Sequence, residues 1–118
     1  EELDAAKIDK EFLQQAVEVV ERNILECDYS VEQFSKDMCM SRMNLYRKVQ
    51  TLTGLTPSEF IRDIKLKKAA QILKSTPNAS INEVATKVGF ATPSYFSKCF
   101  KQKFGMLPSV YAKSDTKK

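Results

Sequence analysis

The sequence has no histidine and no tryptophan among its 118 residues, and it has only three glycines, four prolines and three cysteines. The lack of histidine excludes Cys–His and Ser–His nucleophile pairs and any histidine-ligated metal site. Cys27, Cys39 and Cys99 are widely spaced and form no C-x-x-C pair, so they predict neither a zinc site nor a disulfide framework. We expect all three to be buried side chains in a reducing, cytoplasmic environment. The commonest catalytic arrangements are therefore excluded, and we expect neither an enzyme nor a bound metal or cofactor.

Long apolar runs are also missing. No stretch approaches the roughly 18 apolar residues that indicate a membrane-spanning helix, and the acidic first residues are unlike a secretory signal. The chain does not begin with methionine, which suggests a segment of a longer protein. With 42% apolar residues in 118, we expect one domain or two very small ones, each with a real core.

Charge is divided unevenly along the chain. The net charge is +4, but residues 1–29 hold nine acids and three bases, whereas residues 30–118 hold sixteen bases and six acids. A body with a net charge of +10 attracts polyanions, and nucleic acid is the first candidate. An anionic membrane surface is the second candidate, and a merely solvated basic surface is the third. Because the acidic N-terminal segment would repel phosphate, we expect it to be a brace or linker.

Apolar residues recur at three- and four-residue steps, and no segment alternates with a period of two. This pattern predicts an all-α fold of about seven helices joined by short turns. Asp9 is the expected N-cap of the first helix. Later helices are expected to begin after Ser30, Ser41, Thr56, Ser80 and Thr92 and at Pro108. We divide the chain into a junction (1–9), an N-terminal helix with a first subdomain (10–56), a linker helix (57–75), a second subdomain (76–112) and a basic tail (113–118).

The two subdomains are copies of one pattern. Residues 30–40 align with residues 80–90 at an offset of 50, and the residues from 41 onward align with those from 92 onward at an offset of 51. Each copy is a short capped helix, a tight turn and a second helix that ends in Gly-x-x-Pro. This is the outline of a helix-turn-helix, in which the second helix enters the major groove of DNA. Two copies are too few for a solenoid.

The exposed side of each second helix carries side chains that suit DNA. The first presents Arg42, Met43, Tyr46, Arg47 and Gln50, and the second presents Ser94, Ser97, Lys98 and Lys101. Arg47 is able to contact guanine O6 and N7 with two hydrogen bonds, and Lys98 is able to reach the same acceptors. The 19-residue helix between the copies is roughly 28 Å long, against about 34 Å for one turn of B-DNA. One chain therefore has the reach to place two reading helices in successive major grooves.

Other side chains are expected to be structural. We expect Leu45, Val49, Phe96 and Phe100 to be core residues and Phe90 to be a packed anchor in the second turn. The lysines of the linker helix, Lys65, Lys67, Lys68 and Lys74, are expected to form a solvated face, with phosphate contact as the alternative.

Several motifs resemble the AraC/XylS family of transcription regulators. The segments 59–62 (EFIR) and 66–73 (LKKAAQIL) resemble its linker helix, and 81–85 (INEVA), 94–101 (SYFSKCFK) and 104–111 (FGMLPSVY) resemble its second helix-turn-helix. The resemblance covers roughly residues 12–112. It implies a two-part DNA-binding domain that acts mainly as an activator, with RNA polymerase as a partner. It also implies that Pro93 contacts DNA together with the residues named above. Lys98 departs from the arginine more usual in the family.

The first half carries a narrower resemblance. Residues 9–13, 29–32 and 40–49 are similar to the C-terminal output domain of hybrid two-component proteins, which carry kinase and receiver domains in the same chain. An ordinary AraC-type regulator or a free-standing response regulator would look similar. Because one chain carries both reading helices, we expect this fragment to be monomeric. The alternative is a helical protein-interaction module whose basic face binds an acidic partner.

Overall fold

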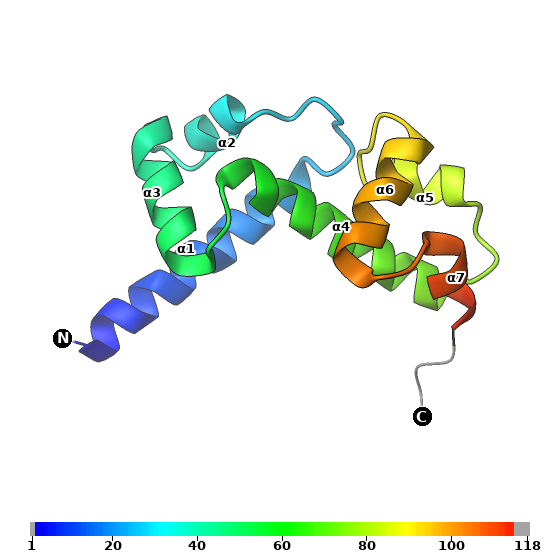
Figure 1. Cartoon of the computed structure of the whole chain (residues 1–118). Helices are drawn as coiled ribbons and strands as arrows, with labels where there is room; N and C mark the ends of the chain where they lie inside the picture. The colour runs from blue at the N-terminus through cyan, green and yellow to red at the C-terminus, as the bar shows by residue number, and fades with distance from the viewer. Residues whose placement is uncertain (1, 115–118) are drawn as a thin grey trace. The chain divides into compact units, whose positions relative to one another are not determined.

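The computed structural model describes residues 2–114, with side chains from Ala5 onward, and within that range it holds seven helices and no strand (Figure 1). The helices are α1 (Glu2–Arg22), α2 (Val31–Asp37), α3 (Arg42–Thr53), α4 (Pro57–Ser75), α5 (Ile81–Lys87), α6 (Pro93–Phe104) and α7 (Pro108–Lys113). The predicted all-α fold is confirmed. Of the proposed basic tail, residues 115–118 lie outside the described residues.

Side-chain caps fix where most of these helices begin. At the start of α2, Gln33 N donates to Ser30 Oγ (3.1 Å) and Ser30 N donates to Gln33 Oε1 (3.2 Å), which closes a capping box. Thr56 and Glu59 form the same reciprocal pair before α4, at 3.1 and 3.0 Å. Ser41, Ser80 and Thr92 each accept a hydrogen bond from a backbone N–H three residues later. The predicted caps after residue 29 are therefore present.

The first helix begins earlier than predicted. It starts at Glu2, so Asp9 lies inside α1 and is not its N-cap, and the segment expected to be a junction is helical from residue 2. The residues involved are good helix formers, among them Ala5, Ala6 and Lys7. The start of α1 was predicted too late because it was taken from a capping side chain, Asp9, whereas the helix extends further toward the N-terminus.

The described chain divides into two compact units. Unit 1 comprises the residues up to Asn23 together with Tyr29–Ile64, and unit 2 comprises Ile24–Asp28 together with the described residues from Lys65 onward. The linker helix α4 is shared, since its first part belongs to unit 1 and the rest to unit 2. The short segment Ile24–Asp28 belongs to unit 2 although its neighbours in sequence belong to unit 1.

Unit 1 has its own apolar core. Phe34 of α2 is fully buried, and its ring stacks on Phe60 of α4 with the centroids 6.0 Å apart and the planes 2° from parallel. Around this pair lie buried side chains of α1, α3 and α4 and of the residues that flank α2, namely Ala16, Val19, Val20, Tyr29, Met38, Leu45, Val49, Ile61 and Ile64. The burial of Leu45 and Val49 fixes which side of α3 faces solvent.

Unit 2 is built on a ladder of aromatic rings. Phe96 packs on Phe90 (5.2 Å between centroids) and on Phe100 (5.7 Å), and Phe100 packs edge-on against Tyr111 of α7 (5.2 Å). The predicted burial of Phe90, Phe96 and Phe100 is confirmed. The rest of this core comes from α4, α5, α6 and α7 and from Val88 directly after α5: Leu66, Ala69, Ala70, Leu73, Val84, Ala85, Val88, Cys99 and Ala112.

The expectation for the cysteines was right for one and wrong for two. Cys99 is buried beside Phe100, but Cys27 and Cys39 are exposed. Both exposed cysteines lie outside the helical segments, where the three- to four-residue periodicity that places a residue on a buried face does not apply.

Candidate nucleic-acid interface

The two helix-turn-helix copies share one turn geometry. In the first, Met40 N donates to Ser35 O at 2.9 Å, and in the second Phe90 N donates to Ala85 O at 2.9 Å. Each bond spans five residues, as in the Schellman motif that ends many helices. A second bond from the preceding N–H, to Lys36 O in one copy and to Thr86 O in the other, completes the motif. The same Schellman motif therefore connects α2 to α3 and α5 to α6.

All five side chains that were predicted on the exposed side of α3 lie there. Met43 is 68% exposed and Tyr46 45% exposed, whereas Leu45 and Val49 on the opposite side are fully buried. A shallow hollow of about 560 Å³ lies along this side, lined by Val31, Arg42, Met43, Tyr46, Arg47, Gln50 and Thr51. The five predicted residues of α3 thus share one surface, which we call the α3 face.

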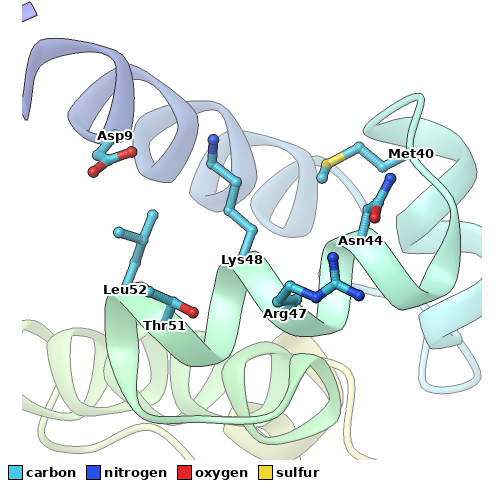
Figure 2. Close-up of a pocket in the computed structure, with 7 residues that line it drawn as sticks. All are labelled: Asp9, Met40, Asn44, Arg47, Lys48, Thr51 and Leu52. Carbon is cyan, nitrogen blue, oxygen red and sulfur yellow. The ribbon is translucent and has the colours of Figure 1, made fainter. Parts of the chain in front are cut away.

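A second hollow, of about 410 Å³, lies where α1 approaches α3 (Figure 2). Its lining residues are Asp9, Met40, Asn44, Arg47, Lys48, Thr51 and Leu52. Lys48 extends from α3 toward α1, and its Nζ lies 5.0 Å from the centroid of the Phe12 ring, a cation–π contact. Arg47 lines both hollows and Lys48 lines only this one. These two neighbouring basic side chains therefore have different surroundings.

In unit 2, the residues predicted on α6 also lie on the solvent side of their helix. Ser94, Lys98 and Lys101 are exposed, Pro93 is exposed at the first helical position, and Ser97 is half-buried. Phe96 and Phe100 occupy the opposite, fully buried side. We call the exposed set the α6 face.

Sequence reasoning missed one residue of this surface. Tyr95 is 48% exposed in the first turn of α6, and its ring packs on Phe90 with the centroids 5.8 Å apart. A helix places Tyr95 on the same side as Lys98, three residues later. That spacing is visible in the sequence, but only Ser94, Ser97, Lys98 and Lys101 were predicted on the exposed side, and Tyr95 was not assigned to either side.

Gly89 is required by the crowding of the second turn. Its φ is +80°, and a Cβ at this position would lie 1.9 Å from the carbonyl oxygen of Ile24. No side chain fits at that distance, and the left-handed backbone already favours glycine. The segment Ile24–Asp28 therefore packs directly against the backbone of the turn.

Lys65 is not part of a solvated face, which corrects the prediction. Its side chain is buried, 6% exposed, and its Nζ donates to Gly89 O at 3.0 Å and to Glu26 O at 3.2 Å. Burial lowers the pKa of the Lys65 ammonium below its ordinary value, against the opposing pull of the Cys27 and Asp28 charges. The sequence gives no local sign of this role, because both acceptors are backbone carbonyls far away in the chain.

Lys74 also departs from the predicted solvated face. Its Nζ donates to the carbonyl and hydroxyl oxygens of Ser114, both at 2.8 Å, and lies 4.6 Å from the centroid of the Tyr111 ring. Lys67 and Lys68 are exposed as expected. Two of the four linker-helix lysines therefore tie unit 2 together.

Among the side chains that the structure describes, those of residues 5–114, no cluster of three or more histidine, cysteine, aspartate or glutamate residues has a metal-binding arrangement. None of the described helices has the length and apolar character needed to cross a membrane. Every buried side-chain nitrogen or oxygen in the described part of the chain has a hydrogen-bond partner.

Residues 34–114 match the family described as a helix-turn-helix domain. A solved transcriptional regulator from Chromobacterium violaceum, described as an AraC-type DNA-binding domain protein, superposes with a TM-score of 0.77 at 26% identity, covering 90% of this chain and 96% of that one. The chain belongs to the AraC family of helix-turn-helix DNA-binding domains. This fold is a DNA-binding one rather than an enzyme fold, and the resemblance seen in the sequence is confirmed.

Two further likenesses refine the AraC-family assignment. The DNA-binding domain of AdpA, solved in complex with a target DNA, superposes with a TM-score of 0.72 at 27% identity and covers 88% of each chain. A protein named histidine kinase P4 from Formosa agariphila is 41% identical over 110 residues, which is 93% of this chain. This chain spans 8% of that kinase's length.

Proposed function

We propose that this domain is the output domain of a two-component system and that it binds duplex DNA sequence-specifically through the α3 face and the α6 face. The observation that carries the proposal is the repeated architecture, in which the same turn precedes two helices whose exposed sides are basic and polar. The likeness to a histidine kinase over nearly the whole of this chain supports the link to a sensor.

Each face offers chemistry suited to DNA. In the α3 face, Arg47 supplies the forked donors that pair with guanine O6 and N7, and Met43 and Tyr46 supply apolar surface for a thymine methyl group. In the α6 face, Lys98 and Lys101 supply positive charge for phosphate or for guanine acceptors, and Ser94 supplies a hydroxyl at the first turn. The net charge of residues 30–118 adds attraction that does not depend on the base sequence.

The length of α4 supports binding in successive major grooves. Its 19 residues amount to roughly 28 Å, which is comparable to the rise of about 34 Å for one turn of B-DNA. With one reading helix before α4 in the sequence and one after it, a monomer has the means to contact two grooves. Where the helices are spaced more closely than the grooves of straight DNA, binding bends the duplex.

The direction of regulation in this proposal is activation, with RNA polymerase as the partner, as the family resemblance implies. Transcription by purified polymerase from a promoter that carries a selected binding site checks this. Added domain is expected to raise the transcript level, and a fall would assign repression instead.

The test of the proposed function is selection of binding sites from a random duplex library, followed by fluorescence anisotropy across a salt series. We expect a selected sequence with two elements about one helical turn apart and an affinity that falls steeply with salt. Salt-dependent binding without an enriched sequence would leave only backbone contacts. If no duplex binds at low salt, the alternative of a protein-interaction module replaces DNA binding.

A further inference from the structure

The buried lysine of unit 2 connects three parts of the chain that are far apart in sequence. Lys65 lies in α4, its acceptor Glu26 O lies in the segment Ile24–Asp28, and its acceptor Gly89 O lies in the turn between α5 and α6. The sequence separations are 39 and 24 residues. A lysine that only adds positive charge to the surface does not have to be buried or to donate to two backbone carbonyls. We therefore infer that Lys65 has a different role from the exposed Lys67 and Lys68.

The contact reaches the turn at Gly89, which is closely packed. Gly89 is packed so closely against Ile24 O that no Cβ fits between them, while Lys65 Nζ holds its carbonyl oxygen at 3.0 Å. The turn therefore packs against the Ile24–Asp28 segment and against the Lys65 ammonium, since a Cβ at Gly89 would lie 1.9 Å from Ile24 O and 3.1 Å from Lys65 Nζ. Because a charged donor makes a stronger hydrogen bond than a neutral one, the direction of this carbonyl is well defined.

A displacement of Gly89 would also displace the start of α6, because the residues that follow Gly89 pack on that helix and cap it. The next residue, Phe90, packs on Tyr95 in the first turn of α6 (5.8 Å between centroids) and on Phe96 in the core (5.2 Å). Thr92, two residues later, caps the helix through Tyr95 N at 3.2 Å. The turn thus sets where the first residues of the α6 face lie.

We propose that Lys65 is a positioning residue for DNA recognition: by holding the Gly89 carbonyl and the Glu26 carbonyl together, it fixes the start of α6 for contact with bases, without touching DNA itself. This inference rests on the proposed function, because it assigns Lys65 to one of the two DNA elements. Loss of the ammonium leaves the α3 face unchanged and loosens the α6 face.

The experiment compares Lys65→Met with Lys68→Met, which removes the same charge from an exposed position of the same helix. Anisotropy is measured at a temperature where circular dichroism shows both variants folded. The probes are a duplex selected by the unaltered chain and two versions of it, each with one element scrambled. Amide hydrogen exchange at Phe90 N is measured without DNA.

If Lys65 is a positioning residue, its replacement should change discrimination at only one of the two DNA sequence elements, the one contacted by α6. In Lys65→Met the penalty for scrambling the α6 element shrinks by roughly ten- to a hundredfold, as expected for loss of hydrogen bonds from a charged donor, while the penalty for scrambling the α3 element stays the same. Phe90 N exchanges at least about tenfold faster. Lys68→Met weakens all duplexes alike, with unaltered exchange at Phe90 N. Lys65→Arg, which keeps charged donors, restores part of the discrimination.

A purely structural lysine gives a different result. Lys65→Met would then melt at a lower temperature yet discriminate both elements as the unaltered chain does, and this outcome would overturn the proposal. If Lys65→Met does not fold, Lys65→Gln replaces the ammonium with a neutral amide on a shorter side chain that cannot hold both carbonyls, and full discrimination together with unaltered exchange in that variant would overturn the proposal as well. If the unaltered chain binds no duplex, the proposed function fails by itself, and the exchange rate at Phe90 N still decides whether Lys65 holds the turn.

Discussion

Cys39 and Gly89 occupy the same position in the two turns, and both have a left-handed backbone, with φ of +59° and +80°. Each donates its N–H to a carbonyl three residues earlier, Lys36 O and Thr86 O respectively. The surroundings differ: Cys39 is exposed, whereas Gly89 is buried against Ile24 O. The first turn therefore tolerates a Cβ at some conformational cost, and the second does not tolerate one at all.

Replacement of Cys39 by glycine should stabilise the domain. A non-glycine residue in the left-handed region costs about 1–2 kcal/mol, and the added flexibility of glycine in the unfolded chain offsets roughly 0.5–1 kcal/mol of that gain. We expect the free energy of unfolding in urea to rise by about 0.5–1 kcal/mol. Cys39→Ala is the control, because it removes the thiol and keeps the strain. Equal stability of the two variants would refute the strain at Cys39.

Replacement of Gly89 by alanine should destabilise the domain severely, by about 3 kcal/mol or more, because backbone strain is joined by overlap with Ile24 O. Gly54→Ala and Gly105→Ala are matched controls. Their φ values of +78° and +81° are nearly the same, but no atom lies within 4 Å of the added Cβ. Urea unfolding should give each control a loss of only about 1–2 kcal/mol. Similar losses at all three glycines would contradict the crowding of the second turn.

Replacement of Arg47 by alanine should abolish the preference for one base pair at the position that Arg47 contacts. We expect a loss of about 1–3 kcal/mol with the selected duplex and relaxed preference at that position. Lys48→Ala is the neighbouring control, since Lys48 lies over the Phe12 ring and outside the α3 face. Anisotropy should show that Lys48→Ala keeps the preference among base pairs. An Arg47→Ala variant with unaltered discrimination would take Arg47 out of base recognition.

The burial of Lys65 should appear in the pH dependence of stability. Because burial lowers the pKa of this ammonium, the unfolded chain binds its proton more tightly than the folded one. The unfavourable contribution is therefore complete below the lowered pKa and disappears as the pH rises toward the ordinary value near 10.5. Urea unfolding between neutral and alkaline pH should show the unaltered chain gaining stability relative to Lys65→Met. Repeating both measurements with Cys27→Ser removes the nearby thiol, and a stability difference that stays flat with pH would contradict the desolvated state of Lys65.

Local chemistry made most of the fold predictable. The start of α2 follows from the Ser30–Gln33 pair and the start of α4 from the Thr56–Glu59 pair, each within four residues. The buried faces of α3 and α6 follow from the spacing of Leu45 and Val49 and of Phe96 and Phe100. These signals act over one helical turn, so a single sequence carries them.

Contacts between distant segments were not predictable in this way. Lys65 looks like any other lysine of α4 until Glu26 O and Gly89 O are brought beside it by the fold. The position of Tyr95 on the exposed side of α6 follows from its spacing to Lys98, but its contact with the Phe90 ring in the preceding turn does not. The early start of α1 has a different cause, since helix propensity continues a helix without any capping signal.

The membership of Ile24–Asp28 in unit 2 limits how halves of such domains are recombined. A single crossover inside α4 would take the second helix-turn-helix from one parent and leave the partners of Gly89 and Lys65, which lie in Ile24–Asp28, with the other. Because Gly89 leaves no room for a Cβ beside Ile24 O, a chimera keeps this packing only where the segment that replaces Ile24–Asp28 follows the same backbone path. In this chain the unit that carries the second reading helix is formed by two segments that pack together but are separate in the sequence.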